Sequence, residues 1–311
     1  MSCSAPRAPS LGCLLALLRA SEAAAPAPVP RAPAAAPAPR LVLRLRASCS
    51  GSRASAHCVC PAAGIGLSIA KMFAREGAKV CATGRNEAAL QALASETGCV
   101  YAVGDLTEPG ACERVVAEAV EKLGGLTTLV NNAGVLQGGA FGVDEGGASL
   151  ANFDYNFNAN TRAPFEMMVH ATPHLIKAGV DAGPSIIAIS SVNGKQSFAT
   201  LAAYCGSKAA IDHIARCAAV DLAPHGVRVN NVNPGVTITP LQKRGGMSDE
   251  AYDAFIERST TVTHPLAQAT GSVSTTDDIA DLVTFLASSR AKFITGEVIC
   301  VDGGRQCLGA R

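Results

Sequence analysis

The sequence predicts an α/β protein built on a doubly wound parallel sheet, and three observations support that class. Short, almost continuous apolar runs alternate with longer segments in which apolar residues recur at helical spacing. Strands that are apolar on both faces are typical of a parallel sheet covered by helices on its two sides, and right-handed crossovers produce that arrangement. The 311 residues, 48% hydrophobic and 16% charged, can form one such domain with a sizeable core.

The helices are predicted from apolar periodicity and from residues that begin or end helices. Ile65, Ile69 and Phe73 lie four residues apart, on one face of a helix expected over 64–77. Asn86 is a favourable N-cap for the helix that follows. Further helices are expected at about 86–95, 113–123, 153–178, 204–222 and 276–287.

The strands are expected between these helices, at about 78–83, 99–103, 126–130, 185–190, 227–232 and 297–301. One more strand is needed before residue 64, yet the stretch 53–58 contains Ser55 and His57. A central strand of a parallel sheet should be almost wholly apolar, so we expect this first strand to be disrupted.

Residues 1–56 differ in composition from residues 57–311, which we interpret as the folded domain. The first part is rich in Ala, Pro, Arg and Ser, and its Pro/Ala tract at 23–39 favours extended, unfolded chain. Its Arg-rich, acid-poor composition is typical of an organelle transit peptide, whereas the apolar run at 11–18 is typical of a secretory signal. A disordered extension, or sequence outside the native reading frame, is the third interpretation. We therefore expect a cytoplasmic protein, or a plastid or mitochondrial one if the segment is a transit peptide.

Charge, cysteine and histidine patterns exclude several classes of protein. Residues 1–60 carry seven arginines and one acid; because the whole chain carries +1, the other 251 residues carry −5. A mildly acidic body offers no surface for nucleic acid, and no apolar run approaches the roughly 20 residues that span a bilayer. The twelve cysteines lack zinc-ligand spacing, and we expect them to be reduced and mostly structural. Five histidines also lack metal spacing, so no metal site is expected: His170, His174, His213, His225 and His264.

Two glycine-containing segments point to a nucleotide cofactor. Gly64 and Gly66 open the first predicted helix, where free N–H groups and the helix dipole favour a pyrophosphate. About 20 residues later, Gly84 and Arg85 follow a strand, at the position where NAD sites carry an acid and NADP sites an arginine. The sequence has no acid at this strand end, which favours NADP(H) over NAD(H).

Ser191, Tyr204 and Lys208 form the clearest candidate catalytic group. Tyr204 and Lys208 are four residues apart on one face of a predicted helix, and Ser191 ends the strand before it. A free tyrosine has a pKa of about 10, so acid–base catalysis near neutral pH requires a lower value. The Lys208 ammonium can supply that change by stabilising the phenolate.

Together these features resemble the short-chain dehydrogenase/reductase family over about residues 62–305, which implies a single-domain Rossmann fold. The shared motifs are Gly64-Ile65-Gly66, Asp105 after the third strand, Asn131-Asn132-Ala133-Gly134, Asn160, Ser191, Tyr204 with Lys208, Asn233-Pro234-Gly235 and Val301-Asp302-Gly303-Gly304. The resemblance implies an NADP(H)-dependent oxidoreductase that interconverts a carbonyl and a secondary alcohol. Within the family the chain looks most like the 3-oxoacyl-(acyl-carrier-protein) reductases, so the expected partners are a small molecule or an acyl thioester.

The resemblance also implies a role for each matching residue. Tyr204 would exchange a proton with the substrate oxygen, Ser191 would polarise the carbonyl, and Lys208 would hold the nicotinamide ribose. Asn160 would hold a water that links Lys208 to solvent. The residues expected around the cofactor are Gly64, Ile65, Gly66, Arg85, Asp105, Asn132, Ala133, Gly134, Tyr204, Lys208, Pro234, Gly235, Thr237 and Thr239. Family members commonly form homotetramers or homodimers through two long helices, here about 153–178 and 204–222.

The chain departs from the family pattern at two places. Val59, Cys60 and Pro61 stand where the family's turn begins Thr-Gly, and cysteine cannot take glycine's positive φ without strain. Extra residues are also expected within 264–275, inside the predicted substrate lid at about 240–272. The first departure leaves a second interpretation open, in which the chain is a catalytically weak or inactive relative that acts as a scaffold or subunit.

Overall fold

The described strands form one parallel sheet, and its strand order creates a crevice at its centre. The structure, a computed structural model, describes residues 55–59 as backbone and residues 63–142 and 146–308 in full. The strands are β1 (Ser55–Val59), β2 (Lys79–Gly84), β3 (Val100–Val103), β4 (Thr128–Asn131), β5 (Ser185–Ile189), β6 (Arg228–Pro234) and β7 (Val298–Val301). Their order is β3-β2-β1-β4-β5-β6-β7, and every neighbouring pair is parallel. The order reverses between β1 and β4, and such a switch point is where doubly wound sheets bind ligands.

The first strand is formed, so the expectation that it is disrupted is wrong. β1 pairs with β2 from Ser55 opposite Lys79 to Val59 opposite Thr83, and with β4 through Ala56, His57 and Cys58. The ladder uses backbone N–H and C=O groups, and the two flanking strands offer partners on both edges, so a polar side chain does not prevent pairing. The unusual turn at Cys60 and Pro61, like the N-terminal extension, lies outside the described residues.

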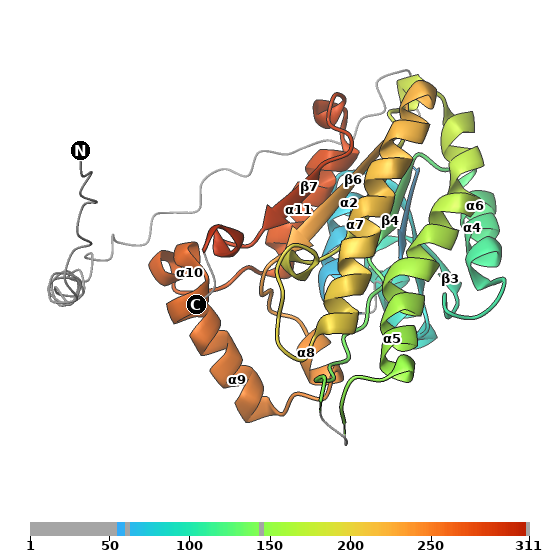
Figure 1. Cartoon of the computed structure of the whole chain (residues 1–311). Helices are drawn as coiled ribbons and strands as arrows, with labels where there is room; N and C mark the ends of the chain where they lie inside the picture. The colour runs from blue at the N-terminus through green and yellow to red at the C-terminus, as the bar shows by residue number, and fades with distance from the viewer. Residues whose placement is uncertain (1–54, 60–62, 143–145, 309–311) are drawn as a thin grey trace, which may run out of the picture. The chain divides into compact units, whose positions relative to one another are not determined.

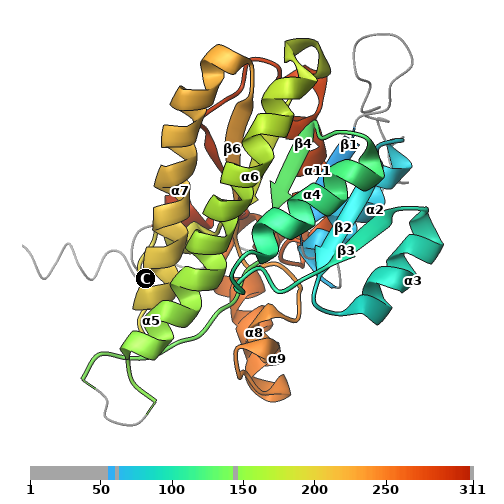
Figure 2. The same ribbon diagram turned by 90° about the vertical axis from the view of Figure 1, so that its right-hand side faces the viewer.

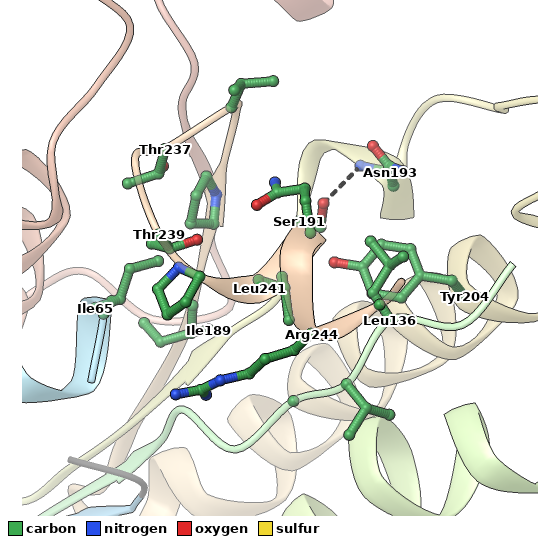
Figure 3. A pocket seen from close by; sticks show the side chains of 18 of the residues that line it. Ile65, Leu136, Ile189, Ser191, Asn193, Tyr204, Thr237, Thr239, Leu241 and Arg244 are labelled. Atoms are coloured by element: carbon green, nitrogen blue, oxygen red, sulfur yellow. Dashed lines mark hydrogen bonds between the residues drawn. The ribbon is translucent and has the colours of Figure 1, made fainter. Parts of the chain in front are cut away.

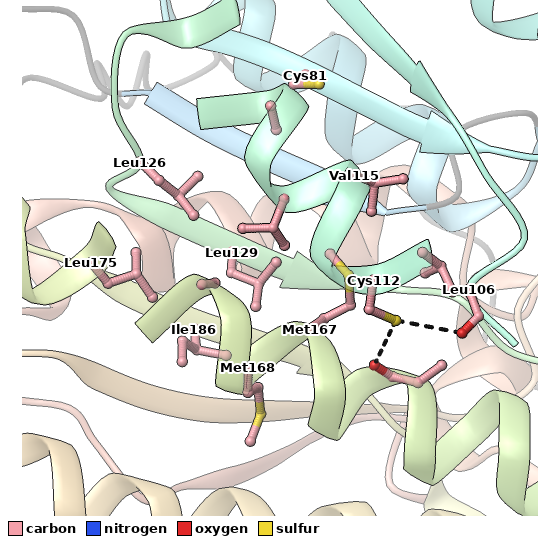
Figure 4. Packing of buried hydrophobic residues seen from close by; sticks show 14 of the residues in the cluster. Cys81, Leu106, Cys112, Val115, Leu126, Leu129, Met167, Met168, Leu175 and Ile186 are labelled. Carbon is pink, nitrogen blue, oxygen red and sulfur yellow. Dashed lines mark hydrogen bonds between the residues drawn. The ribbon is translucent and has the colours of Figure 1, made fainter. Parts of the chain in front are cut away.

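Helices cover both faces of the sheet, as Figures 1 and 2 show. One face carries α2 (Ile65–Arg75), α3 (Glu87–Thr97) and α11 (Thr276–Ala287); the other carries α4 (Ala111–Leu123), α5 (Leu150–Phe157), α6 (Ala163–Ala178) and α7 (Ala202–Leu222). Each layer has its own apolar core. Figure 4 shows the second core, where Val115, Met167 and Ile186 pack between the sheet and its helices.

Most predicted elements are present, and one predicted helix is divided. Asn86 caps α3 by accepting the Ala89 N–H at 3.1 Å, and α11 has the expected bounds. The helix expected over 153–178 is interrupted by a π-helical segment, Asn158–Arg162, between α5 and α6. Such insertions in a helix are frequent at functional sites.

The segment expected as a lid folds into short helices. It contains α8 (Leu241–Arg244), α9 (Asp249–Arg258), a π-helical turn (Ser259–Thr263) and α10 (Pro265–Thr270). Figure 1 shows α8, α9 and α10 beyond the carboxyl end of β6. None of the described helices is both long enough and apolar enough to cross a bilayer.

Candidate active site

A cleft of about 730 Å³ lies at the carboxyl ends of the strands. The segments that line it follow successive strands: Gly64 precedes α2, Arg85 follows β2, Asn132 follows β4, Ser191 follows β5 and Gly235 follows β6. Residues far apart in the sequence therefore meet at one edge of the sheet. This is the location that the doubly wound topology predicts for a ligand.

Ser191 and Tyr204 face each other across the catalytic end of the cleft (Figure 3). The Ser191 hydroxyl oxygen accepts the Asn193 N–H at 3.1 Å, and the Ser191 side chain also forms a hydrogen bond with the Tyr204 side chain. Tyr204 is only 5% exposed. Burial raises the pKa of Tyr204 to about 12, and the Ser191 hydrogen bond opposes that effect. Tyr204 is therefore held as a neutral phenol, ready to donate a proton.

Lys208 lies one helical turn after Tyr204 and is equally buried. Its ammonium donates to the Ile189 carbonyl oxygen at 3.1 Å and lies 6.0 Å from the centre of the Tyr204 ring. Burial lowers the pKa of Lys208 to about 8, although the Asp212 carboxylate opposes this effect. We expected Lys208 to lower the pKa of Tyr204; in the protein alone the pKa of Tyr204 is raised instead, because burial outweighs the opposing hydrogen bond from Ser191.

Asp212, a buried carboxylate that we did not predict, belongs to a hydrogen-bond network that reaches Ser191. Asp212 accepts from the amides of Asn231 and Asn233, both at 2.8 Å, and Asn233 also donates to the Ser191 carbonyl oxygen at 2.8 Å. This network ties α7, β6 and the end of β5 together behind the catalytic hydroxyls. The sequence could have indicated this network, because polar side chains at alternate positions of a buried strand require hydrogen-bond partners.

Asn160 is near Lys208, but its side chain already has protein partners. Its oxygen accepts the Val135 N–H at 2.9 Å, and its amide donates to the Val135 carbonyl and to the Ser207 hydroxyl, both at 3.0 Å. Asn160 thus joins the π-helical segment to α7 and to the loop after β4. Both donor hydrogens of the Asn160 amide are therefore used within the protein.

The opposite end of the cleft is polar and exposed. Arg85 pairs with Asp105 at 3.4 Å, and the side chains of the two residues are 72% and 33% exposed. Partial burial would raise the pKa of Asp105, but hydrogen bonds from Thr107 and the Arg85 charge hold it below its usual value. Arg85 lines both the cleft and a smaller adjoining cavity, and Asp105 and Ala133 line only the smaller one.

Two glycines give the cleft the shape that a dinucleotide needs. Gly64, at the N-cap of α2, has φ +67°, and a side chain there would be strained and would point toward Thr239. A Cβ on Gly134 would lie 3.4 Å from both the Asn160 oxygen and the Lys208 nitrogen. The backbone can therefore approach a ligand closely at the helix start and beside Lys208, which fits a nicotinamide dinucleotide.

Most of the predicted residues come together, with few exceptions. The cleft is lined by Gly64, Ile65, Arg85, Asn132, Gly134, Ser191, Tyr204, Lys208, Pro234, Gly235, Thr237 and Thr239. Gly66 lies inside α2, and Asn160 lies behind Gly134. The prediction missed Leu136, Phe198 and Arg305, because only the tertiary fold brings them to the cleft.

The described residues contain no cluster of His, Cys, Asp and Glu that could bind a metal ion. His264 has a packing role. Its Nε2 accepts the Val236 N–H at 3.1 Å, and its Nδ1 lies 3.1 Å from the Ser259 carbonyl oxygen. The ring thus joins the segment before α10 to the loop after β6.

Comparison with known proteins agrees with this geometry. A family model described as enoyl-(acyl carrier protein) reductase matches residues 60–306. The chain is 34% identical over 251 residues to a 2,5-dichloro-2,5-cyclohexadiene-1,4-diol dehydrogenase of Sphingobium indicum, covering 78% of this chain and 92% of the relative. It is 33% identical over 258 residues to the xanthoxin dehydrogenase of Arabidopsis thaliana, covering 79% and 87%.

A solved structure is also similar to this fold. A short-chain dehydrogenase/reductase from Caenorhabditis elegans, determined with cofactor, superposes with a TM-score of 0.74 at 29% identity, covering 83% of this chain and 96% of that one. The bovine L-xylulose reductase is 32% identical over 242 residues, covering 78% and 91%. The chain belongs to the short-chain dehydrogenase/reductase family, and it is an NAD(P)-dependent oxidoreductase acting on CH–OH or C=O groups.

Proposed function

We propose that this protein is an NADP(H)-dependent reductase of a ketone or 3-oxoacyl group, and a dehydrogenase of the corresponding secondary alcohol. The observation that carries the proposal is the buried arrangement of Ser191, Tyr204 and Lys208 at one end of a dinucleotide-sized cleft. When bound, the nicotinamide supplies or accepts the hydride. The protein supplies the proton and the position of the substrate oxygen.

In reduction, the substrate oxygen is held by the hydroxyls of Ser191 and Tyr204. Ser191 donates to the carbonyl oxygen and stabilises the charge that develops on it. Tyr204, neutral because its pKa is raised, transfers its proton to that oxygen. In oxidation the Tyr204 phenolate takes the proton from the alcohol. Lys208, with one hydrogen directed to the Ile189 carbonyl, has two others for the ribose hydroxyls and for the phenolate.

The preference for NADP(H) is supported by the end of β2. Gly84 and Arg85 occupy the place where an acid would bind a ribose 2′-hydroxyl, and Arg85 lines the cleft. Its pairing with Asp105 is long and exposed, so the guanidinium can move to a 2′-phosphate at little cost.

An acyl-thioester substrate is supported by one lid residue. Arg244 lines the cleft, and Figure 3 shows its side chain extending away from Tyr204. Lys243, the neighbouring cation of the lid, instead pairs with Asp249 at 2.7 Å and lies over the Tyr252 ring. The contribution to an acidic carrier or CoA is therefore assigned to Arg244.

A homodimer or homotetramer is supported by apolar side chains left exposed on α5–α7. Tyr155, Phe165, Val169 and Val220 are each about half exposed or more. Exposed apolar groups on long helices favour association with a second copy.

Fluorescence titration and an activity screen test the proposed function. NADPH should bind the purified protein more tightly than NADH does. NADPH oxidation should then be found with at least one member of a panel of acetoacetyl-CoA, quinones, steroids and small ketones. If no cofactor binds at millimolar concentration, the catalytic proposal is contradicted and the alternative of an inactive scaffold is supported.

A further inference from the structure

The charged side chains that line the cleft are all cationic, and the proposed cofactor contacts use only some of them. The cleft is lined by four cationic side chains, Arg85, Lys208, Arg244 and Arg305, and no Asp or Glu is among its described lining residues. In the proposed function, Arg85 meets the adenosine phosphate, Lys208 the ribose, and Arg244 an acidic carrier. Arg305 comes from the segment after β7 and has no assigned ligand.

Arg305 is held beside the catalytic loop by an aromatic ring. Its guanidinium carbon lies 4.5 Å from the centre of the Phe198 ring. Phe198 belongs to the loop that joins Ser191 to α7, which carries Tyr204, and it lines the same cleft. Stacking fixes the plane of a guanidinium while leaving its N–H edge free to donate. Arg305 is thus stacked on the loop that leads to Tyr204 and contributes to the lining of the cleft.

The Asp302 carboxylate, whose charge acts on this guanidinium, does not form an ion pair with it. The Asp302 oxygens accept backbone N–H groups, one from Gly304 at 3.0 Å and the other from Gln306 at 2.7 Å. None of the ion pairs among residues 63–142 and 146–308 includes Arg305. Burial lowers the pKa of Arg305, the Asp302 charge opposes that effect, and Arg258 adds a like charge. A partly buried cation without a paired anion has lost part of its hydration, and hydrogen bonds to an anionic ligand would compensate for that loss.

We propose that Arg305 binds a carboxylate of the substrate, so that the natural substrate is an oxo acid or the corresponding hydroxy acid. This inference rests on the proposed carbonyl–alcohol chemistry and adds a substrate class to it. The planar fork of arginine matches a carboxylate through two parallel hydrogen bonds. The carboxylate would lie between Arg305 and the catalytic hydroxyls, and the oxo group would reach Ser191 and Tyr204.

Matched acids and esters test this assignment. Oxo acids with the ketone at the second, third and fourth carbon are compared with their ethyl esters, with saturating NADPH. We expect one acid to be preferred over its ester by about 10- to 100-fold in kcat/KM, the range of a hydrogen-bonded charge. In Arg305→Ala that preference should fall to about one, because kcat/KM for the acid falls to the value for the ester.

Two further variants separate charge from packing. Arg305→Lys keeps the charge without the planar fork, and we expect it to retain only part of the preference. Arg290→Ala is the matched control, because Arg290 also lies over an aromatic ring, Phe285, but does not line the cleft. It should leave the preference intact.

The outcomes distinguish this inference from the proposed function. Equal use of acids and esters, or a preference that survives in Arg305→Ala, overturns the carboxylate assignment while carbonyl reduction stands. If NADPH binds but neither acids, esters nor any other carbonyl compound is reduced, the proposed function fails and the inference fails with it.

Discussion

The two ends of the cleft are built differently. At the catalytic end, Tyr204 and Lys208 are 5% and 4% exposed, and they are held by buried hydrogen bonds. At the adenosine end, Arg85 and Asp105 are 72% and 33% exposed and joined at 3.4 Å. Surface pairs of this kind stabilise a protein by about 0–1 kcal/mol, whereas leaving a buried charge unpaired costs about 3–5 kcal/mol. The catalytic end is therefore fixed in advance, and the adenosine end can rearrange around its ligand.

This difference predicts that changes at the two ends alter different quantities. A variant that removes the hydroxyl of Ser191 or Tyr204 at the catalytic end should lower turnover and leave cofactor affinity almost unchanged. A variant at the adenosine end should change cofactor affinity and selectivity, and leave the chemical step intact.

The largest of these effects is expected for Ser191→Ala. Loss of the hydroxyl removes one donor to the substrate oxygen and the partner of Tyr204, so kcat should fall by about 100- to 1,000-fold. Steady-state kinetics and NADPH titration give the two readouts. Ser95→Ala, an exposed change on α3, is the control. A large loss of NADPH affinity in Ser191→Ala would contradict the separation of the two ends.

Arg85→Ala should have a smaller effect, confined to the phosphorylated cofactor. Loss of a charge-assisted contact to the 2′-phosphate is expected to lower kcat/KM for NADPH by about tenfold and to leave the value for NADH unchanged. Equal losses for both cofactors would show that Arg85 supports the local fold and does not read the phosphate.

The lowered pKa of Lys208 predicts that NADPH affinity depends on pH, with an effect about as large as that of Arg85→Ala. Its pKa is lowered to about 8, so the cofactor-free protein carries the ammonium below that pH and loses it above. NADPH affinity should therefore weaken by about tenfold between pH 7 and 9. The folded state also binds fewer protons than the unfolded chain between pH 8 and 10.5, so stability should rise with pH in that window. In Lys208→Met the NADPH affinity should not vary between pH 7 and 9. A variant that keeps the pH dependence of the wild-type protein would contradict the assignment to Lys208.

The smallest effect concerns the lid. A Cβ on Gly245, at the end of α8, would lie 2.9 Å from the Leu136 carbonyl oxygen on the opposite wall. Gly245→Ala should therefore hold the lid slightly open and speed NADPH release by a few-fold, measured by stopped-flow fluorescence. Slower release would show that the lid does not close through this contact.

The sequence predicted the parallel order of the elements because apolar strands and capped helices are local patterns. Asn86 and the helix at 276–287 are examples. It did not predict the π-helical segment at Asn160, because that segment depends on bonds to Val135 and Ser207 that form only in the folded chain.

The sequence also predicted part of the candidate site. Tyr204, Lys208 and Ser191 follow from spacing and strand ends, whereas Asp212 and Arg305 depend on contacts between distant segments. The first strand was expected to be disrupted because its side chains are partly polar. It forms nevertheless, through backbone pairing with both neighbouring strands.

The most direct test of the account is Tyr204→Phe, with turnover and NADPH affinity measured on the same preparation. Phenylalanine keeps the ring and removes the proton donor, so kcat should fall by about 100- to 10,000-fold. The dissociation constant for NADPH should stay within about twofold of the wild-type value. Turnover within tenfold of wild type would contradict the assignment of Tyr204 as the proton donor, and with it the proposed mechanism.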